Sequence, residues 1–156
     1  MAMIGSVIIA CPLEQVFEVT NNHVTEWSNI VEEEETLNVT PEVIGSTFRT
    51  VTSEHGRKLK FDGVVTRHSP PFESGIRMEG PAFSLTVDYT FENVPEGTRV
   101  TQRSTVTGKG IFRIIISTMG FLMKKSNSGA LQDELNRLKA FCENPPKSGD
   151  SQPQQS

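Results

Sequence analysis

The sequence predicts an α+β protein in which a curved, seven-stranded antiparallel sheet wraps around a long C-terminal helix. Apolar and polar residues alternate from Phe83 to Glu92, a pattern typical of a strand with one buried face. Similar short segments, separated by turn residues, lie on both sides of this strand. From Ile111 to Glu143 the apolar residues instead recur at helical spacing. A run of strands followed by a helix belongs to the α+β class.

The first predicted element is a strand from Ile4 to Ala10, and two short helices follow it directly. Pro12 suits the first turn of a helix, because its φ angle is already helical and its missing N–H loses no hydrogen bond there. The residues Thr20–Asn22 break this helix, and a second one follows them. The apolar residues of the two helices are Val16, Phe17 and Val19, and then Val24, Trp27 and Ile30.

Six strands in hairpin succession come next, each ended by a turn signal. The turn residues are Pro41–Ser46, His55-Gly56, Ser69–Pro71, Gly80-Pro81 and Val94–Thr98. The strands run over residues 31–39, 47–54, 58–68, 72–79, 83–92 and 99–107. We expect the first strand of the chain to pair with the last at one edge of the sheet, and the short helices to close one end.

Composition indicates one soluble domain. The chain has 156 residues, 35% of them hydrophobic, and this length suits a single core. Its net charge of −4 gives no electrostatic case for binding nucleic acid. No segment approaches the ~20 apolar residues of a membrane-spanning helix, and the N-terminus lacks the pattern of a signal peptide. We therefore expect a cytoplasmic domain over residues 1–143, without membrane insertion, and a disordered tail over residues 144–156.

Two features of the sequence are compatible with a disulfide or a metal site, but free thiols and a solvated strand are the favoured interpretations. Cys11 and Cys142 each lie beside apolar residues, which favours buried free thiols, although a disulfide stays open. Glu32–Glu35 form a run of carboxylates, but neighbouring residues of a strand point to opposite faces, so only alternate members could meet at one ion. We expect a solvated edge strand there, and neither a metal nor a cofactor.

Several short motifs match those of one superfamily in order and spacing. They lie within residues 4 to 143 and comprise Pro12–Phe17 followed by Trp27, Gly45 before the third strand, Val64–Pro71, Glu96–Val100 and Leu135–Glu143. On these motifs the chain resembles the START-like superfamily, also called SRPBCC or polyketide cyclase/dehydrase-like. The resemblance implies the helix-grip fold, in which the sheet grasps the C-terminal helix and a deep cavity lies between them. It also implies that an enzyme of this type uses scattered polar residues of the cavity rather than a short motif.

The alternation along the last strand also predicts polar side chains on the inner face of the sheet. In register with Val100, the residues Gln102 and Ser104 face inward. Burying such groups without partners costs about 1–3 kcal/mol each, so a ligand cavity has more use for them than a solid core. Opposite them, the segment Ser126–Ala130 interrupts the apolar stripe of the helix. Two alternatives stay open: the helix is broken there, or the polar pair reaches water at a sheet end.

Other candidate site residues occupy strand positions that are predicted to face inward and have side chains that could bind a ligand. Tyr89 suits either a hydrogen bond to a ligand or a core position, and Arg67 suits either a clamp on an anionic group or a surface position. His68 has outward parity and His55 lies in a turn, so neither is assigned a role. Methionines suit an adaptable pocket as well as an ordinary core. The predicted ligand-binding residues are Phe61, Arg67, Met78, Phe83, Leu85, Tyr89, Gln102, Ser104, Met119, Met123 and Asn127.

Three functions fit such a site. We expect binding of a small hydrophobic or amphipathic molecule, such as a lipid, an isoprenoid or an aromatic, polyketide-like compound. The first alternative is a cyclase or dehydratase-like enzyme, in which Tyr89, Gln102 and Arg67 polarise a carbonyl and position an enolate. The second is a protein-interaction module similar to a co-chaperone. Catalysis is less favoured because Tyr89 and Arg67 are the sole inward ionisable candidates and neither has an assured partner, so no catalytic residue is assigned.

Overall fold

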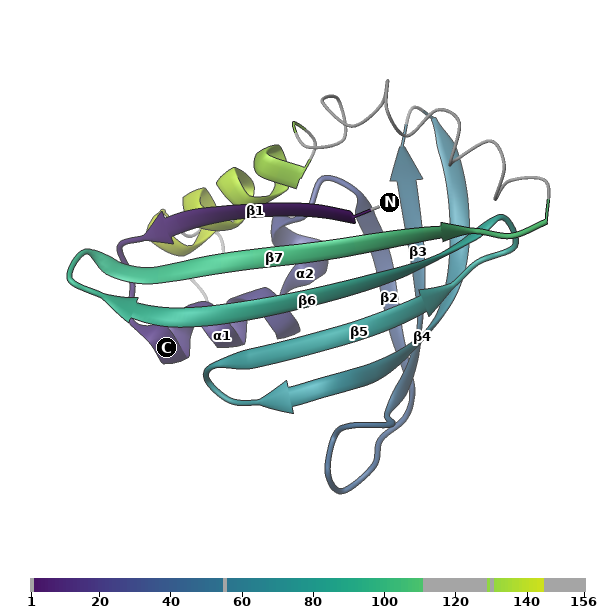
Figure 1. Cartoon of the computed structure of the whole chain (residues 1–156), viewed down its shortest axis with the longest axis horizontal. Helices are drawn as coiled ribbons and strands as arrows, with labels where there is room; N and C mark the ends of the chain where they lie inside the picture. Colours follow the sequence, from purple (N-terminus) through teal and green to yellow (C-terminus); the bar gives the residue numbers. More distant parts are fainter. Residues whose placement is uncertain (1, 55, 111–128, 130, 145–156) are drawn as a thin grey trace, which may run out of the picture.

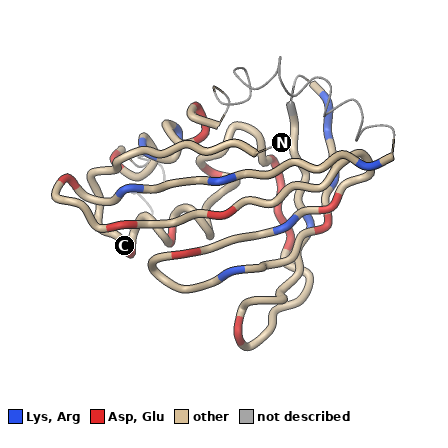
Figure 2. Tube along the Cα trace, in the orientation of Figure 1, with Lys and Arg blue, Asp and Glu red and all other residues tan. Residues whose placement is uncertain are grey.

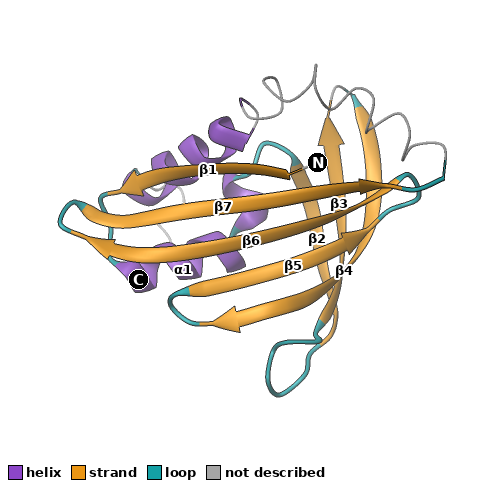
Figure 3. Ribbon diagram, viewed as in Figure 1, coloured by secondary structure: helices purple, strands orange, loops and turns teal. Residues whose placement is uncertain are grey.

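The computed structural model describes residues 2–54, 56–110, 129 and 131–144. A single sheet of seven strands dominates it, and the helices gather on one side of this sheet (Figure 1, Figure 3). The strands are β1 (Ala2–Ile9), β2 (Val31–Asn38), β3 (Thr47–Glu54), β4 (Arg57–Ser69), β5 (Glu73–Glu79), β6 (Phe83–Val94) and β7 (Gly97–Gly108). The helices are α1 (Leu13–Asn22), α2 (Val24–Trp27) and a C-terminal helix over residues 131–143. The predicted helix-grip architecture is confirmed.

All neighbouring strands pair antiparallel, in the order β1-β7-β6-β5-β4-β3-β2. The first strand pairs with the last, with Val7 opposite Val100, as predicted. The other edge strand is β2, and the sheet twists so strongly that β2 and β3 run across the direction of β7 (Figure 1). This curvature gives the sheet a concave side, against which the helices pack.

Two short helices follow β1 as predicted, but both of their predicted ends are wrong. α1 begins directly after Pro12. Thr20–Asn22 do not break α1: the side chains of Thr20 and Asn21 donate hydrogen bonds to the carbonyl oxygens of Val16 and Phe17, one turn earlier, and the helix continues to Asn22.

The second helix ends earlier than predicted. α2 ends at Trp27, because Ser28 is extended and its hydroxyl oxygen accepts hydrogen bonds from the backbone N–H groups of Ile30 and Val31. The expectation that Ile30 belongs to this helix is therefore wrong, since the serine turns the chain directly into β2.

The predicted C-terminal helix is confirmed over residues 131–143. Residues 111–128, 130 and 145–156 lie outside the described part of the chain, so the first half of the predicted helix and the predicted tail are not tested. The apolar stripe of the described helix packs against β1, β6, β7, α1 and α2. This main core cluster comprises Ile9, Leu13, Val16, Phe17, Trp27, Phe91, Val100, Leu131, Leu135, Leu138 and Cys142.

A second, smaller apolar cluster lies on the concave side near β3, β4 and β5. Its buried members are Phe48, Phe61 and Met78, and Leu59, Val65, Ile76, Phe83 and Leu85 pack against them. The ring of Phe48 lies over Gly63, its direct neighbour across β3 and β4, where a Cβ atom would collide with the ring. Glycine at this position lets the aromatic ring lie flat against the sheet.

The end of the C-terminal helix is tied to the end of β1 by polar contacts. Lys139 Nζ donates a hydrogen bond to the carbonyl oxygen of Ile8 at 2.8 Å, and the backbone N–H of Ala10 donates one to Glu143 Oε2 at 2.8 Å. Cys11 Sγ donates to the carbonyl oxygen of Cys142 at 3.2 Å. Both cysteines are free thiols, and burial raises the pKa of Cys142 to about 12. These contacts fix the helix to the edge of the sheet.

The acidic run lies on an exposed edge strand, as predicted. All of Glu32–Glu35 are exposed on β2, and Lys58 Nζ lies 3.0 Å from Glu32 Oε1. Elsewhere, acidic and basic residues are dispersed along the strands (Figure 2). Among the described residues, no group of three or more His, Cys, Asp or Glu side chains is placed to hold a metal ion. No helix in this part of the chain is long and apolar enough to span a membrane.

The tight turn between β6 and β7 depends on Gly97. Its φ angle of 142° lies in a region that residues with a side chain rarely adopt, and a Cβ atom would collide with the carbonyl oxygen of Ile9. The next residue, Thr98, donates a hydrogen bond from Oγ1 to the carbonyl oxygen of Cys11 at 2.8 Å. The turn therefore packs directly on the junction of β1 and α1.

We predict that Gly97→Ala lowers the free energy of unfolding by about 2 kcal/mol or more, because backbone atoms must move to admit the methyl group. Gly45→Ala is the control: Gly45 also has a positive φ, of 92°, but its nearest contact is an ordinary 3.6 Å from Thr40 Cγ2. The control should show the cost of the φ angle alone, about 1 kcal/mol. Equal losses for the two variants in denaturant unfolding would contradict the packing of this turn.

Candidate functional site

A row of polar side chains crosses the concave side of the sheet. Gln102 on β7 lies directly opposite Tyr89 on β6, Tyr89 lies opposite Ser74 on β5, and Ser74 lies opposite His68 on β4. Residues that pair directly across strands share a face. We call Gln102, Tyr89, Ser74 and His68 the polar row.

Contacts at both ends show that the polar row faces the helices. Gly5 continues the row onto β1, and a Cβ atom there would lie 3.2 Å from Leu131 and 3.3 Å from Leu135 of the C-terminal helix. At the other end, the ring centroids of His68 and Phe17, a residue of α1, are 6.0 Å apart. The row therefore lies between the sheet and its helices.

Gln102 and Ser104 are buried on this face, as predicted from alternation. Their exposed fractions are 9% and 4%. Gln102 Nε2 donates a hydrogen bond to Ser104 Oγ at 3.0 Å, so the two groups partly satisfy each other inside the fold. The alternative in which they reach bulk water at a sheet end is wrong.

Two other buried hydroxyl groups have no hydrogen-bond partner among the described residues: Ser74 Oγ and Thr50 Oγ1. Ser74 is 4% exposed and Thr50 is 1% exposed. A buried hydroxyl without a partner costs about 1–3 kcal/mol, and native proteins rarely leave one without a reason. Neither residue was predicted from the sequence. Each lies two positions from an apolar residue of the second cluster on its own strand, Ile76 for Ser74 and Phe48 for Thr50, and therefore shares its face.

The prediction that Arg67 faces inward is wrong, and a β-bulge in β4 is the cause. The pairing of β4 with β5 shifts between Val65 and Arg67, which makes Thr66 an extra residue. Arg67 therefore lies opposite Gly75 on the convex side, where it is exposed. Its Nε atom lies 3.9 Å from a carboxylate oxygen of Glu73.

The same bulge brings His68 into the site. Simple alternation from Leu59 along β4 assigns His68 to the outer face, but the extra residue reverses the parity and places it opposite Ser74. No residue type in this stretch marks the bulge, since Thr66 is an ordinary strand residue. The histidine, His68, therefore lies in the site, and the arginine that was predicted there from the sequence, Arg67, does not.

The remaining predicted site residues divide into two groups. Phe61 and Met78 are buried in the second cluster, and Phe83 and Leu85 pack against it, so all four lie on the concave side. Met119, Met123 and Asn127 lie outside the described residues. The polar row thus lies between the main core cluster, which contains Phe91 and Val100, and this apolar second cluster.

Tyr89 is held as a neutral hydroxyl. Burial raises its pKa well above the ordinary value, and the nearby carboxylate Glu134 raises it further. Glu134 belongs to the C-terminal helix, where it accepts hydrogen bonds from the Ser28 hydroxyl and from the backbone N–H of Asn29 at 2.8 Å. The Tyr89 ring stacks on Phe91 with a centroid separation of 6.0 Å. At neutral pH this side chain donates or accepts a hydrogen bond without losing its proton.

Glu34 is the member of the acidic run that shares the concave side. It lies directly opposite Thr50, which in turn lies opposite Phe61. The residue keeps contact with solvent, but partial burial raises the pKa of its carboxyl group above the ordinary 4.5. A negative charge is therefore less favourable at this position than in water.

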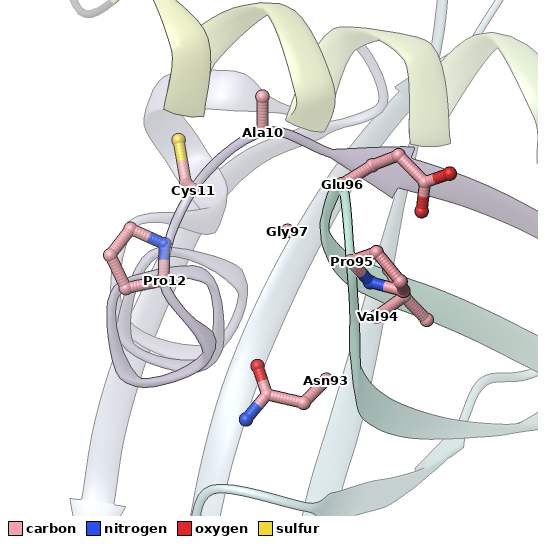
Figure 4. Close-up of a pocket in the computed structure, with 8 residues that line it drawn as sticks. All are labelled: Ala10, Cys11, Pro12, Asn93, Val94, Pro95, Glu96 and Gly97. Atoms are coloured by element: carbon pink, nitrogen blue, oxygen red, sulfur yellow. The ribbon is translucent and has the colours of Figure 1, made fainter.

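A shallow pocket of about 350 Å³ lies away from the polar row (Figure 4). It is wide open to solvent and lies between the junction of β1 with α1 and the turn from β6 to β7. Its lining residues are Ala10, Cys11, Pro12, Asn93, Val94, Pro95, Glu96 and Gly97. Because it encloses so little, we do not assign it as the ligand site.

The curved sheet, its gripping helix and the polar groups on its concave side define a helix-grip protein of the START-like, SRPBCC type. The chain belongs to the family described as polyketide cyclase / dehydrase and lipid transport, whose family model matches residues 3–143. Comparison with the sequences of curated proteins gave no match.

Solved structures agree with this fold. The protein TTHA0849 from Thermus thermophilus superposes with a TM-score of 0.74 at 17% identity, covering 91% of this chain and 97% of that one. The di-domain ARO/CYC StfQ from the steffimycin biosynthetic pathway gives 0.74 at 16% identity, over 95% of this chain and 52% of that one. Ara h 8.0201 gives 0.64 at 10% identity, over 91% and 97%. At such identities the likeness shows the fold alone.

We predict that Thr50→Val raises the free energy of unfolding by about 1 kcal/mol, because it removes a buried hydroxyl without a partner and keeps the side-chain shape. Thr98→Val is the matched control, since Thr98 is fully buried but donates a hydrogen bond to Cys11. The control should lose about 1–3 kcal/mol. Denaturant unfolding measures both, and a loss of stability in Thr50→Val would mean that its hydroxyl has a partner.

We also predict that Glu34→Gln stabilises the protein at pH 7 by less than ~1 kcal/mol, because a partly buried charge becomes a neutral amide. The pKa of Glu34 is higher in the folded protein than in the unfolded chain. The protonated carboxyl group therefore contributes stability that is fully present below pH 4.5 and is lost as the pH rises through the raised, folded-state pKa. The advantage of the variant should therefore shrink as the pH falls through the raised pKa toward 4.5 and should change no further below 4.5. Thermal unfolding at pH 7 and pH 4 measures the difference in stability between the variant and the parent protein. A difference that grows on acidification would contradict a raised pKa for Glu34.

Proposed function

We propose that the protein binds a small hydrophobic or amphipathic molecule between the concave side of the sheet and the C-terminal helix, in the cytoplasm. The observation that carries the proposal is the set of polar groups buried on this side, two of them hydroxyls without a partner among the described residues. Apolar clusters flank these groups on both sides. Apolar walls with a few convergent polar groups are typical of small-molecule sites.

A core built only for stability would place apolar residues at these positions. Ser74, Tyr89, Gln102 and Ser104 occupy inward positions on three adjacent strands, and buried hydroxyls and amides stabilise a fold only when they are paired. A bound molecule with an oxygen atom would supply the missing partner. The family description, which names polyketide cyclases, dehydrases and lipid transport, supports a ligand of this general kind.

A cyclase or dehydratase-like enzyme is the second candidate, and His68 is the observation that favours it. A histidine next to Ser74, which in turn lies next to Tyr89, provides the inward ionisable group that catalysis by proton transfer needs. StfQ, which shares this fold, is a di-domain ARO/CYC protein, in keeping with this candidate. Binding is preferred because the raised pKa of Tyr89 makes it a poor proton donor and a poor base at neutral pH, which leaves one group where acid–base chemistry usually uses two.

The test is native mass spectrometry of protein purified without detergent, followed by solvent extraction and titration with the neutral dye Nile red. We expect a co-purifying apolar compound, or saturable Nile red binding that Leu85→Asp on the apolar wall abolishes. Thr86→Asp is the control, since Thr86 faces the convex side next to Leu85. Protein that carries no compound and excludes the dye would contradict the proposal and favour a protein-interaction module.

A further inference from the structure

We infer that the polar row selects ligands whose buried end carries a neutral oxygen group, a ketone or a hydroxyl, over ligands that end in a carboxylate or phosphate. This inference rests on the proposed function and names the chemistry that the site recognises. In this inference, the polar end of the ligand contacts His68 and Ser74. Neither residue is among the ligand-binding residues predicted from the sequence.

The first argument is the hydrogen-bonding capacity of the row. Ser74 Oγ is buried without a partner among the described residues, and it lies between Tyr89 on one side and His68 on the other. A serine hydroxyl, a neutral tyrosine and a histidine can each donate one hydrogen bond and accept another. A ketone oxygen accepts two such bonds, and a hydroxyl both donates and accepts, so either group matches the row without any change of charge.

The second argument is the electrostatic environment of the concave side. The carboxylate of Glu134 acts on Tyr89 from the C-terminal helix, and Glu34 faces the same concave side from β2. Burial, and to a smaller extent the carboxylate of Glu134, raises the pKa of Tyr89, and burial raises the pKa of Glu34. The inner side of the sheet therefore already disfavours negative charge, and an anionic head group would add to it.

The third argument is the position of Arg67. With inward parity it would have supplied a cation for an anionic ligand, but the bulge at Thr66 turns it to the convex side, next to Glu73. Apart from Arg57 at the exposed start of β4, the titratable residues described on the concave side of β4 to β7 are His68 and Tyr89. The strand positions that replace the arginine clamp carry an imidazole and hydroxyl groups in place of a guanidinium.

The experiment compares two probes of nearly equal shape, 6-acetyl-2-(dimethylamino)naphthalene and 6-(dimethylamino)-2-naphthoate, which differ in a ketone against a carboxylate. Calorimetric titration at neutral pH should give a roughly tenfold or greater preference for the ketone, the effect of burying an unpaired charge. Equal affinities, or a preference for the naphthoate, would overturn the inference and leave the proposed function standing. A ketone probe that does not bind would also overturn it, and Nile red binding then decides the proposed function separately.

Variants locate the preference on the polar row. Ser74→Ala should weaken ketone binding about three- to tenfold, while its unfolding midpoint stays the same or rises because an unpaired hydroxyl is removed. His68→Phe, which keeps an aromatic ring against Phe17, should show a similar loss. Arg67→Gln is the matched control on the convex side and should leave the ketone affinity unchanged. An equal loss in Arg67→Gln, or unchanged binding in Ser74→Ala, would show that the row does not contact the ketone.

Discussion

The register of the antiparallel sheet, with its bulge at Thr66, decides which side chains reach the interior. Each pair directly across two strands shares a face, so one shift in β4 changes the chemistry of the whole site. With the bulge, the row across four strands reads Gln102, Tyr89, Ser74 and His68. Without it, an arginine would stand where the histidine stands, and the site would suit an anionic group.

The interior combines strong packing at one end with unsatisfied polar groups further along. The described part of the C-terminal helix is fixed to the sheet by apolar contacts of Leu131, Leu135 and Leu138, and by hydrogen bonds from Lys139 and to Glu143. This apolar packing provides the stability that lets the concave side keep hydroxyl groups without partners. Protein sites that bind ligands commonly retain such a local cost, because the groups involved gain their partners on binding.

Much of the fold could be predicted from the sequence, since alternation and turn residues are local signals. The strands near Phe83–Glu92 and the antiparallel order follow from them, and so do the inward positions of Gln102 and Ser104. His68 and Arg67 were assigned to the wrong faces because a bulge is set by pairing with β5, which no local pattern reveals. Ile30 was wrongly assigned to the second helix for a similar reason, because α2 ends at hydrogen bonds to the side chain of Ser28 that the sequence pattern does not reveal.

Contacts between a bound ketone and the methyl groups of the sheet would reveal most directly which face is the site. Intermolecular nuclear Overhauser effects should connect 6-acetyl-2-(dimethylamino)naphthalene to Ile76, Met78 and Val87 on the concave side. Val51 and Val64 on the convex side should show none. The opposite pattern, or contacts restricted to the shallow pocket beside Cys11, would contradict a ligand site on the concave side.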